Sequence, residues 1–234
     1  MDPLTDAYVL IIVGNMHRSL SVETKTNELR HFGGFVRSMS KRLIAAKLKL
    51  EKELMSELST IDHPDQVTNQ LTAIAILTKC SIEQLLDIFL RQKMTVKRDL
   101  SVGSQSLIDI VWRIRHTFEC VQRLFVNGQL TNTLRIFRNR NWIPKMLMDY
   151  LNNEALSFSK CLLPEIESAN EQCASLQVET VDSQVLLTKC NSFLESVCNE
   201  SQWMVEQKCE LFEDSKALIQ FLNVVLEAFH EVCC

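Results

Sequence analysis

Glycine and proline are unusually scarce in this chain, whose 234 residues include 5 Gly and 4 Pro. Average usage, roughly 7 % Gly and 5 % Pro, would give about 28 such residues. An all-β sandwich or barrel needs a turn roughly every 8–12 residues, many of them built on Gly or Pro, and a doubly wound nucleotide fold needs a glycine-rich first loop. The scarcity therefore favours a few long helices with few interruptions, because the other residues carry no large helix penalty.

The overall charge and the cysteines restrict the classes of function. The chain has a net charge of −4, which argues against a nucleic-acid-binding protein that works through overall positive charge. Its 9 Cys, an odd number, are typical of reduced thiols in a cytosolic protein rather than of a disulfide framework. The most apolar early run, residues 7–13, is too short to span a bilayer, and Asp2 and Asp6 precede it where a signal peptide would be positively charged. We therefore expect no signal peptide and no transmembrane segment.

The first long run of helical spacing covers residues 22–58. Its apolar residues alternate in steps of three and four from Leu29 to Leu50, which places them on one face of a helix, with basic residues elsewhere on its circumference. Gly33-Gly34 lies inside this stripe and is the point at which a continuous helix is least favoured. This face is available for the core or for a partner.

A pair of helices is predicted over residues 66–98. The turn at residues 62–65 precedes a short apolar helix with few charges, which should be buried on most sides. The second helix of the pair starts at Ser81, where Gln84 three residues later completes a capping-box pattern.

The most regular apolar stripe belongs to the next predicted helix, which Asn127-Gly128 ends because Gly tolerates the left-handed backbone conformation at a helix C-terminus. Its apolar residues follow one another in steps of four and three. We take this stripe as a candidate partner interface, and the alternative interpretation is a face buried in the core. The stripe consists of Leu107, Val111, Ile114, Phe118, Val121 and Phe125.

The two parts of the chain differ in charge. Residues 1–150 carry 21 Lys and Arg against 15 Asp and Glu, whereas residues 151–234 carry 4 against 14. We predict an N-terminal helical region over residues 1–100, which is basic and includes the helix pair described above. A second helical bundle is predicted over residues 101–234, and it is acidic from residue 151 on. The predicted fold is all-α, an elongated stack of antiparallel helices.

No catalytic motif can be assembled from the sequence. It contains no phosphate-binding G-x-x-x-x-G-K-[ST] loop, no G-x-G-x-x-G, no G-x-S-x-G, no H-E-x-x-H and no C-x-x-C. His116 and Cys120 have a spacing that two zinc ligands could use, but so does a packed cysteine beside a partly exposed histidine. His230 with Cys233 and Cys234 lies at a frayed chain end, where a preorganised metal site is not expected. We therefore expect no enzyme, no cofactor and no bound metal.

A cluster of arginines is the best candidate for anion binding. Arg135, Arg138 and Arg140 alternate with Phe137 and Trp142, and guanidinium groups among aromatic rings can bind phospholipid headgroups or nucleic acid. The alternative interpretation is a solvated basic turn between helices.

Several segments resemble a known family. Gln70–Leu77 and Ser81–Lys93 resemble subunit 1 of the conserved oligomeric Golgi complex, which has a short apolar helix, a turn and a leucine-x-x-phenylalanine-leucine-x-x-arginine/lysine helix at this point. Upstream, residues 7–10 and Met16–Leu20 look like the segment that follows that family's N-terminal coiled coil. Downstream, residues 142–144 and Cys190–Met204 look like the continuation of its helical rod.

The resemblance implies a subunit of a vesicle-tethering complex whose legs are stacked helical bundles, with no catalytic residues to carry over. The implied partners are other subunits of the complex, SNARE proteins, small GTPases and the cytoplasmic face of the Golgi membrane, but no nucleic acid. Family members are several times longer, so the resemblance implies an internal portion truncated at both ends. The alternative function is a peripheral membrane-binding helical bundle that uses its basic N-terminal part and the arginine cluster on anionic lipid.

Overall fold

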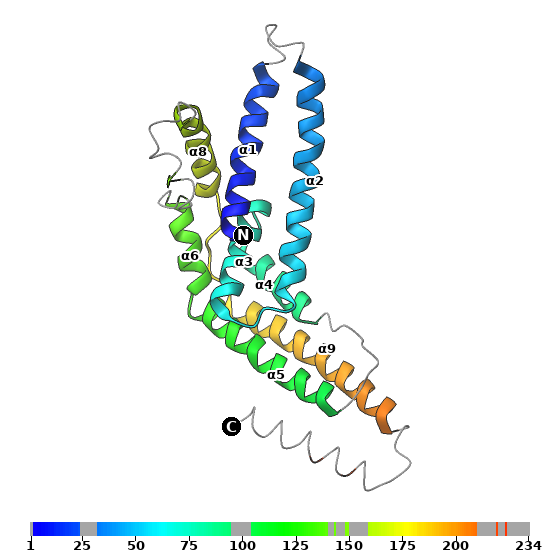
Figure 1. The fold of residues 1–234 in the computed structure, drawn as a ribbon. Coiled ribbons are helices and arrows are strands. Elements are labelled where there is room, and N and C mark those ends of the chain that lie inside the picture. Colours follow the sequence, from blue (N-terminus) through cyan, green and yellow to red (C-terminus); the bar gives the residue numbers. More distant parts are fainter. Residues whose placement is uncertain are drawn as a thin grey trace.

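The structure is a computed structural model that describes residues 2–23, 32–94, 104–139, 143, 148–149, 159–209, 219 and 223. These residues form helices, and no strand occurs among them, so the all-α prediction is confirmed (Figure 1). The helices are α1 (Pro3–Glu23), α2 (Gly33–Leu58), α3 (Pro64–Thr78), α4 (Ile82–Met94), α5 (Ser104–Val121), α6 (Gln129–Arg138), α8 (Ser159–Ala174) and α9 (Ser183–Cys209).

Helices α1 and α2 form a long antiparallel hairpin (Figure 1). The sequence predicts helical spacing over residues 22–58, with Gly33-Gly34 as the point where a continuous helix is least favoured. Helix α1 ends at Glu23 and α2 begins at Gly33, and residues 24–31 lie outside the described residues. The high conformational freedom of Gly33-Gly34 disfavours a helix interior, and the pair accordingly stands at a helix start. His17 joins the two arms, because its Nε2 lies 2.8 Å from the carbonyl oxygen of Val36.

Helix α3 is the centre of the bundle. Ten of the eleven side chains from Val67 to Leu77 are buried, so the predicted burial on most sides is confirmed. The capping box that starts α4 is confirmed as well: Gln84 N–H donates to Ser81 Oγ at 3.2 Å, and Ser81 N–H donates to Gln84 Oε1 at 2.9 Å. Each side chain thereby satisfies a backbone donor that the helix start leaves unpaired.

The end of α5 is set by a local backbone change. The last turn, residues 122–126, widens into a π-helix, and Asn127 N–H donates to the Gln122 carbonyl oxygen at 2.8 Å. Gly128 follows with φ of 74°, the left-handed conformation that the sequence led us to expect. Helix α6 starts directly afterwards and is regular through Arg138.

Side-chain hydrogen bonds connect helices that are distant in sequence. Helices α1 and α8 are joined by three of these bonds: Tyr8 Oη donates to Asn170 Oδ1 at 2.7 Å, Gln172 Nε2 donates to Asn15 Oδ1 at 2.6 Å, and Ser19 Oγ donates to Glu165 Oε1 at 3.0 Å. On the other side of the bundle, Lys189 Nζ of α9 donates to Asp87 Oδ1 of α4 at 2.6 Å.

The described helices do not share one axis direction. Helices α5 and α9 lie side by side and antiparallel, inclined to the α1–α2 hairpin at its base (Figure 1). The predicted elongated antiparallel stack is therefore not confirmed. Buried residues from Leu4 to Val197 form one cluster, so the predicted regions 1–100 and 101–234 share a core in the described part. Within the described ranges, no helix combines the length and apolar content that crossing a membrane needs.

Candidate functional site

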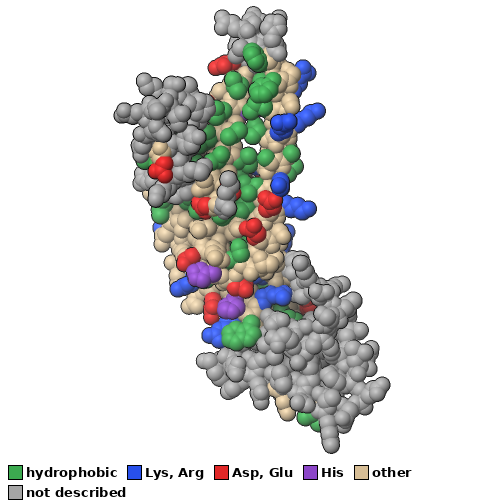
Figure 2. All heavy atoms as spheres, viewed as in Figure 1, with side chains coloured by type: hydrophobic (Ala, Val, Ile, Leu, Met, Phe, Trp, Pro, Cys, Tyr) green, Lys and Arg blue, Asp and Glu red, His purple; other side chains and the backbone are tan. Residues whose placement is uncertain are grey.

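The far end of the α1–α2 hairpin exposes several large apolar side chains. Leu20 and Val22 of α1 are 36 % and 59 % exposed, and Phe32 and Phe35 at the start of α2 are 55 % and 59 % exposed. Figure 1 shows this end of the hairpin standing beyond α3 and α4, and Figure 2 shows hydrophobic side chains gathered over the hairpin. The fold therefore presents apolar area at a projecting end.

The same half of α2 is strongly basic. Residues 33–50 carry five Lys and Arg and no Asp or Glu. Nearer the base, Lys47 pairs with Glu51 at 3.5 Å and Lys49 pairs with Glu53 at 3.6 Å. Three basic side chains in this half of α2 have no carboxylate partner among the described residues, and they lie toward the projecting end. They are the exposed Arg37, Lys41 and Arg42. Figure 2 shows Lys and Arg side chains along the outer edge of α2.

A second apolar row runs along α2 and ends in a groove. Ile44 and Leu48 are 59 % and 60 % exposed, and half-buried Met55 lies two turns further on the same helix face. Leu48 and Met55 line a hollow of about 520 Å³ against Gln92 of α4. Lys52 also lines this hollow and adds a basic edge to it. The row is apolar in the middle and polar at its margin, as protein interfaces are.

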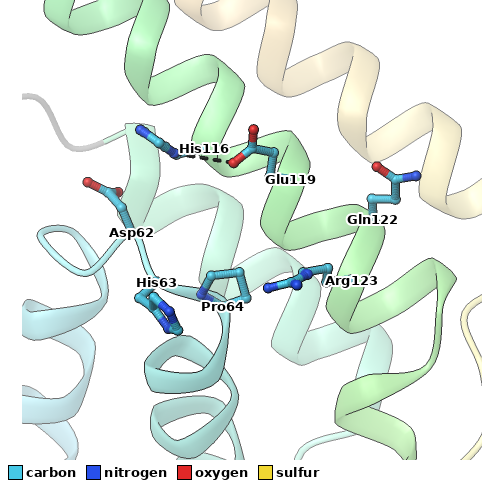
Figure 3. A pocket seen from close by; sticks show the side chains of 7 residues that line it. All are labelled: Asp62, His63, Pro64, His116, Glu119, Gln122 and Arg123. Carbon is cyan, nitrogen blue, oxygen red and sulfur yellow. Dashed lines mark hydrogen bonds and ion pairs between the residues drawn. The ribbon is translucent and has the colours of Figure 1, made fainter.

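A second hollow, of about 530 Å³, lies between the α2–α3 turn and α5 (Figure 3). His63 and Pro64 come from the turn, and Glu119 comes from α5. Hydrogen bonding from Arg115 at 3.1 Å lowers the pKa of Glu119, and His116 Nδ1 lies 3.4 Å from the other carboxylate oxygen. These groups are solvated and paired with one another, so the hollow offers surface charge rather than a poised acid or base.

A buried lysine lies behind this hollow. Lys93 of α4 has a fully buried side chain, and its Nζ donates to Asp62 Oδ1 at 2.7 Å and to the Ile61 carbonyl oxygen at 2.5 Å. Its ammonium also lies 5.9 Å from the ring centroid of Phe89. The lysine therefore anchors the α2–α3 turn to α4, a structural role.

The candidate zinc pair has the packed arrangement. Cys120 is buried and its Sγ lies 3.4 Å from the Asp62 carbonyl oxygen, whereas His116 is half-exposed. Burial raises the pKa of the Cys120 thiol to about 11, so the thiol is neutral at pH 7. Across the part of the chain that the structure describes, no three His, Cys, Asp or Glu side chains are grouped to hold a metal ion. His230, Cys233 and Cys234 lie outside the described residues.

The predicted arginine cluster is placed only in part. Arg135 and Arg138 are exposed one turn apart on α6, but Phe137 between them is buried in the core. The expected interleaving of arginines with an exposed Phe137 is therefore wrong, because α6 turns its apolar face inward. Arg140 and Trp142 lie outside the described residues.

The side chains of the predicted interface stripe on α5, as far as they are described, pack against other helices of the same chain. Val121 and Phe125 are buried, and Phe125 lies 6.3 Å from Phe89 between ring centroids. Half-buried Phe118 meets Phe193 of α9 edge-on at 6.0 Å. Val121 and Phe125 therefore belong to the core, as the alternative interpretation held, and half-buried Ile114 packs against it. The side chains of Leu107 and Val111 lie outside the described part.

The sequence interpretation missed the exposed apolar rows of α2. Ile44 and Leu48 are spaced by four residues, and Phe35 lies off the Leu29–Leu50 stripe. A second apolar face on a basic helix was the signal that could have identified them.

Comparison of the chain with protein-family models, with curated proteins and with solved structures finds no match. The function of the chain is therefore inferred from the surfaces described above and from the resemblance of segments such as residues 70–93.

Proposed function

We propose that this chain is a helical scaffold subunit of a Golgi vesicle-tethering complex and acts in retrograde intra-Golgi transport through protein–protein contacts. Its place is the cytoplasmic face of the Golgi membrane, and its partners are other subunits of the complex, with SNARE proteins and small GTPases as further partners. The resemblance of residues 70–93 to subunit 1 of the conserved oligomeric Golgi complex supports the family. The all-helical fold suits a scaffold, and the proposal gives the chain no catalytic role.

The observation that carries a binding role is the apolar row of Ile44, Leu48 and Met55 on α2. Fully burying a leucine or isoleucine side chain contributes about 1.5–3 kcal/mol. Because Ile44 and Leu48 are 59 % and 60 % exposed, a partner that covers both gains roughly 2–4 kcal/mol from them alone. That amount is enough for these two side chains to be central contacts of an interface.

The row is best suited to an amphipathic helix of another subunit. It is straight, follows one helix face and leads into the hollow beside Gln92. Exposed Lys41 and Lys52 flank it, so a partner helix with acidic residues beside its apolar stripe is complementary in charge.

The proposal is tested by affinity purification of the tagged full chain from cell extract, followed by identification of the proteins that copurify. The test variant is Ile44→Asp/Leu48→Asp. The matched control is Ile136→Asp/Leu187→Asp, which places the same charges at apolar side chains that are 51 % and 60 % exposed on α6 and α9.

We expect the wild-type chain and the control to retain other subunits of the Golgi tethering complex and the α2 variant to lose them. Recovery of no tethering subunit with the wild-type chain refutes the family proposal. If the α2 variant and the control behave alike, the complex is supported but the assignment of its interface to α2 is wrong.

A further inference from the structure

The projecting end of the hairpin combines apolar and basic side chains, of which only Lys41 also flanks the apolar row assigned to the scaffold role. Its apolar side chains, Leu20, Phe32 and Phe35, are each exposed by more than a third. Large apolar side chains that remain in water at the end of a projection indicate a binding surface rather than part of the core.

Basic side chains lie directly behind this apolar end. Arg37 and Lys41 follow Phe35 by two and six residues, which is about 3 and 9 Å along the helix axis. Arg18 on α1 is exposed at a similar level, because His17 beside it contacts the Val36 carbonyl oxygen of α2. The headgroup layer of a bilayer is roughly 5–8 Å thick on each side. Apolar groups toward the end and cations about 3 to 9 Å further back therefore match the order of layers that a bilayer surface presents.

The net charge at this end of the hairpin indicates which kind of partner surface it can bind. Among the residues that the structure describes at this end, Arg18, Arg37, Lys41 and Arg42 are exposed. Two carboxylates, Glu23 and Glu165, lie nearby, and the Ser19 hydroxyl donates to Glu165 Oε1 at 3.0 Å. The excess is positive, so an anionic partner is complementary. Arginine and lysine beside phenylalanine and leucine are the residue types that hold helices at anionic membrane interfaces.

We propose that the far end of the α1–α2 hairpin binds the surface of an anionic lipid bilayer. Phe32, Phe35 and Leu20 enter the interface, and the basic side chains behind them contact lipid phosphate and carboxylate groups. The binding is peripheral and reversible. This inference goes beyond the scaffold role and does not depend on it, because vesicle binding is a property of the purified chain alone.

The hairpin end suits this role better than the arginine cluster on α6. Arg135 and Arg138 flank one exposed apolar side chain, Ile136, while Phe137 is buried in the core. The α6 surface therefore offers charge with little apolar area, and it provides a matched control on the same protein.

The test is flotation of the full chain with vesicles of phosphatidylcholine containing roughly 30 mol % phosphatidylserine, and with vesicles of phosphatidylcholine alone. One variant, Phe32→Ser/Phe35→Ser, removes apolar area, and a second, Arg37→Ser/Lys41→Ser, removes charge. The control is Arg135→Ser/Ile136→Ser. All six substituted side chains are exposed, so far-UV circular dichroism should show an unchanged fold.

We expect the wild-type chain to bind only the anionic vesicles, and less as NaCl rises from about 0.05 to about 0.5 M. Each basic residue near an anionic surface contributes about a fivefold increase in partitioning, so the loss of Arg37 and Lys41 should weaken binding about 25-fold. Loss of two half-exposed phenylalanines should weaken it by a similar factor. The α6 control should stay within about twofold of the wild-type chain.

Absence of wild-type binding to anionic vesicles refutes the proposal. It is also refuted if both hairpin variants bind as the wild-type chain does, or if the α6 control alone loses binding, which would move the lipid site to α6. Soluble polyglutamate serves as a competitor that carries charge without a membrane. If it displaces the chain fully and the phenylalanine variant has no effect, the surface binds an acidic protein segment and the lipid proposal is wrong.

Discussion

The buried lysine of α4 allows a sharp test of how the bundle is held together. Lys93 has no exposed side-chain area, and its ammonium has two oxygen acceptors, one from the Asp62 carboxylate and one from the Ile61 backbone. The perturbations are Asp62→Ala, Lys93→Met and the two combined. They separate the cost of leaving a buried charge without its partner from the net contribution of the pair.

The expected effects are strongly unequal. Removing one partner of a fully buried ion pair costs about 3–5 kcal/mol. The Asp62 side chain is 50 % exposed, so water screens the pair, and we reduce the expected cost of Asp62→Ala to about 2 kcal/mol. Lys93→Met removes the charge and keeps most of the volume, while Asp62 remains hydrated, so it should change stability by less than about 1 kcal/mol.

The assay is urea unfolding followed by circular dichroism, with thermal unfolding as a second measurement. A cost of 2 kcal/mol should lower the Tm by about 4–8 °C for a chain of this size. The double variant should recover most of the stability that Asp62→Ala loses. If Lys93→Met destabilises the protein as much as Asp62→Ala does, the ion pair itself is strongly stabilising and the reasoning from desolvation is refuted.

Three further outcomes follow from local contacts. Ser81→Ala removes one half of the capping box and should cost about 1 kcal/mol in urea unfolding, whereas Ser81→Asp should retain most of the stability. Burial raises the thiol pKa of Cys120 and Cys173 from 9.0 to about 11, so the folded state holds these protons more tightly than the unfolded state, and stability measured against pH should fall between pH 9 and 11. Lys189→Ala removes the contact with Asp87 between α9 and α4, and its cost, about 1 kcal/mol, should shrink in high salt.

The helix pair α3–α4 could be predicted because its signals are local. Ser81 and Gln84 form the capping box that their spacing indicates. The segment from Val67 to Leu77 carries no charged side chain and ends in five consecutive apolar residues, a pattern that predicts burial on most sides. Such features depend on neighbouring residues and therefore appear in a single sequence.

Which apolar residues stay exposed could not be predicted in the same way. The spacing of Val36, Leu54 and Leu58 identifies the inner face of α2, and these three side chains are buried. Whether Ile44 and Leu48 are also covered depends on whether another helix reaches that level of the bundle, which is a tertiary property. Lys93 is a similar case, since a lysine in the last turn of a helix is normally solvated.

The prediction that Phe137 takes part in an arginine-rich binding cluster was wrong, although the sequence contained the signal for its burial. Leu130, Leu134 and Phe137 follow one another in steps of four and three and are all buried, so they form the apolar face of α6. Grouping Phe137 with Arg135, Arg138 and Arg140 as an anion-binding cluster separated it from that face. The lesson is that an aromatic residue among arginines should first be tested against the helical period of the residues before it.

Because α2 is longer than α3, the residues of α2 that stabilise the core lie apart from those that are available for binding. Helix α2 has 26 residues and α3 has 15, so α2 is longer by about 16 Å, roughly three turns. Leu54 and Leu58, near the base of α2, are buried in the shared core, whereas Phe35, Ile44 and Leu48 contribute little to it. Substitutions in the outer part of the hairpin should therefore change what the chain binds with little effect on whether it folds. This separation is what makes the docking and membrane experiments interpretable, because a lost interaction there cannot be attributed to a lost core.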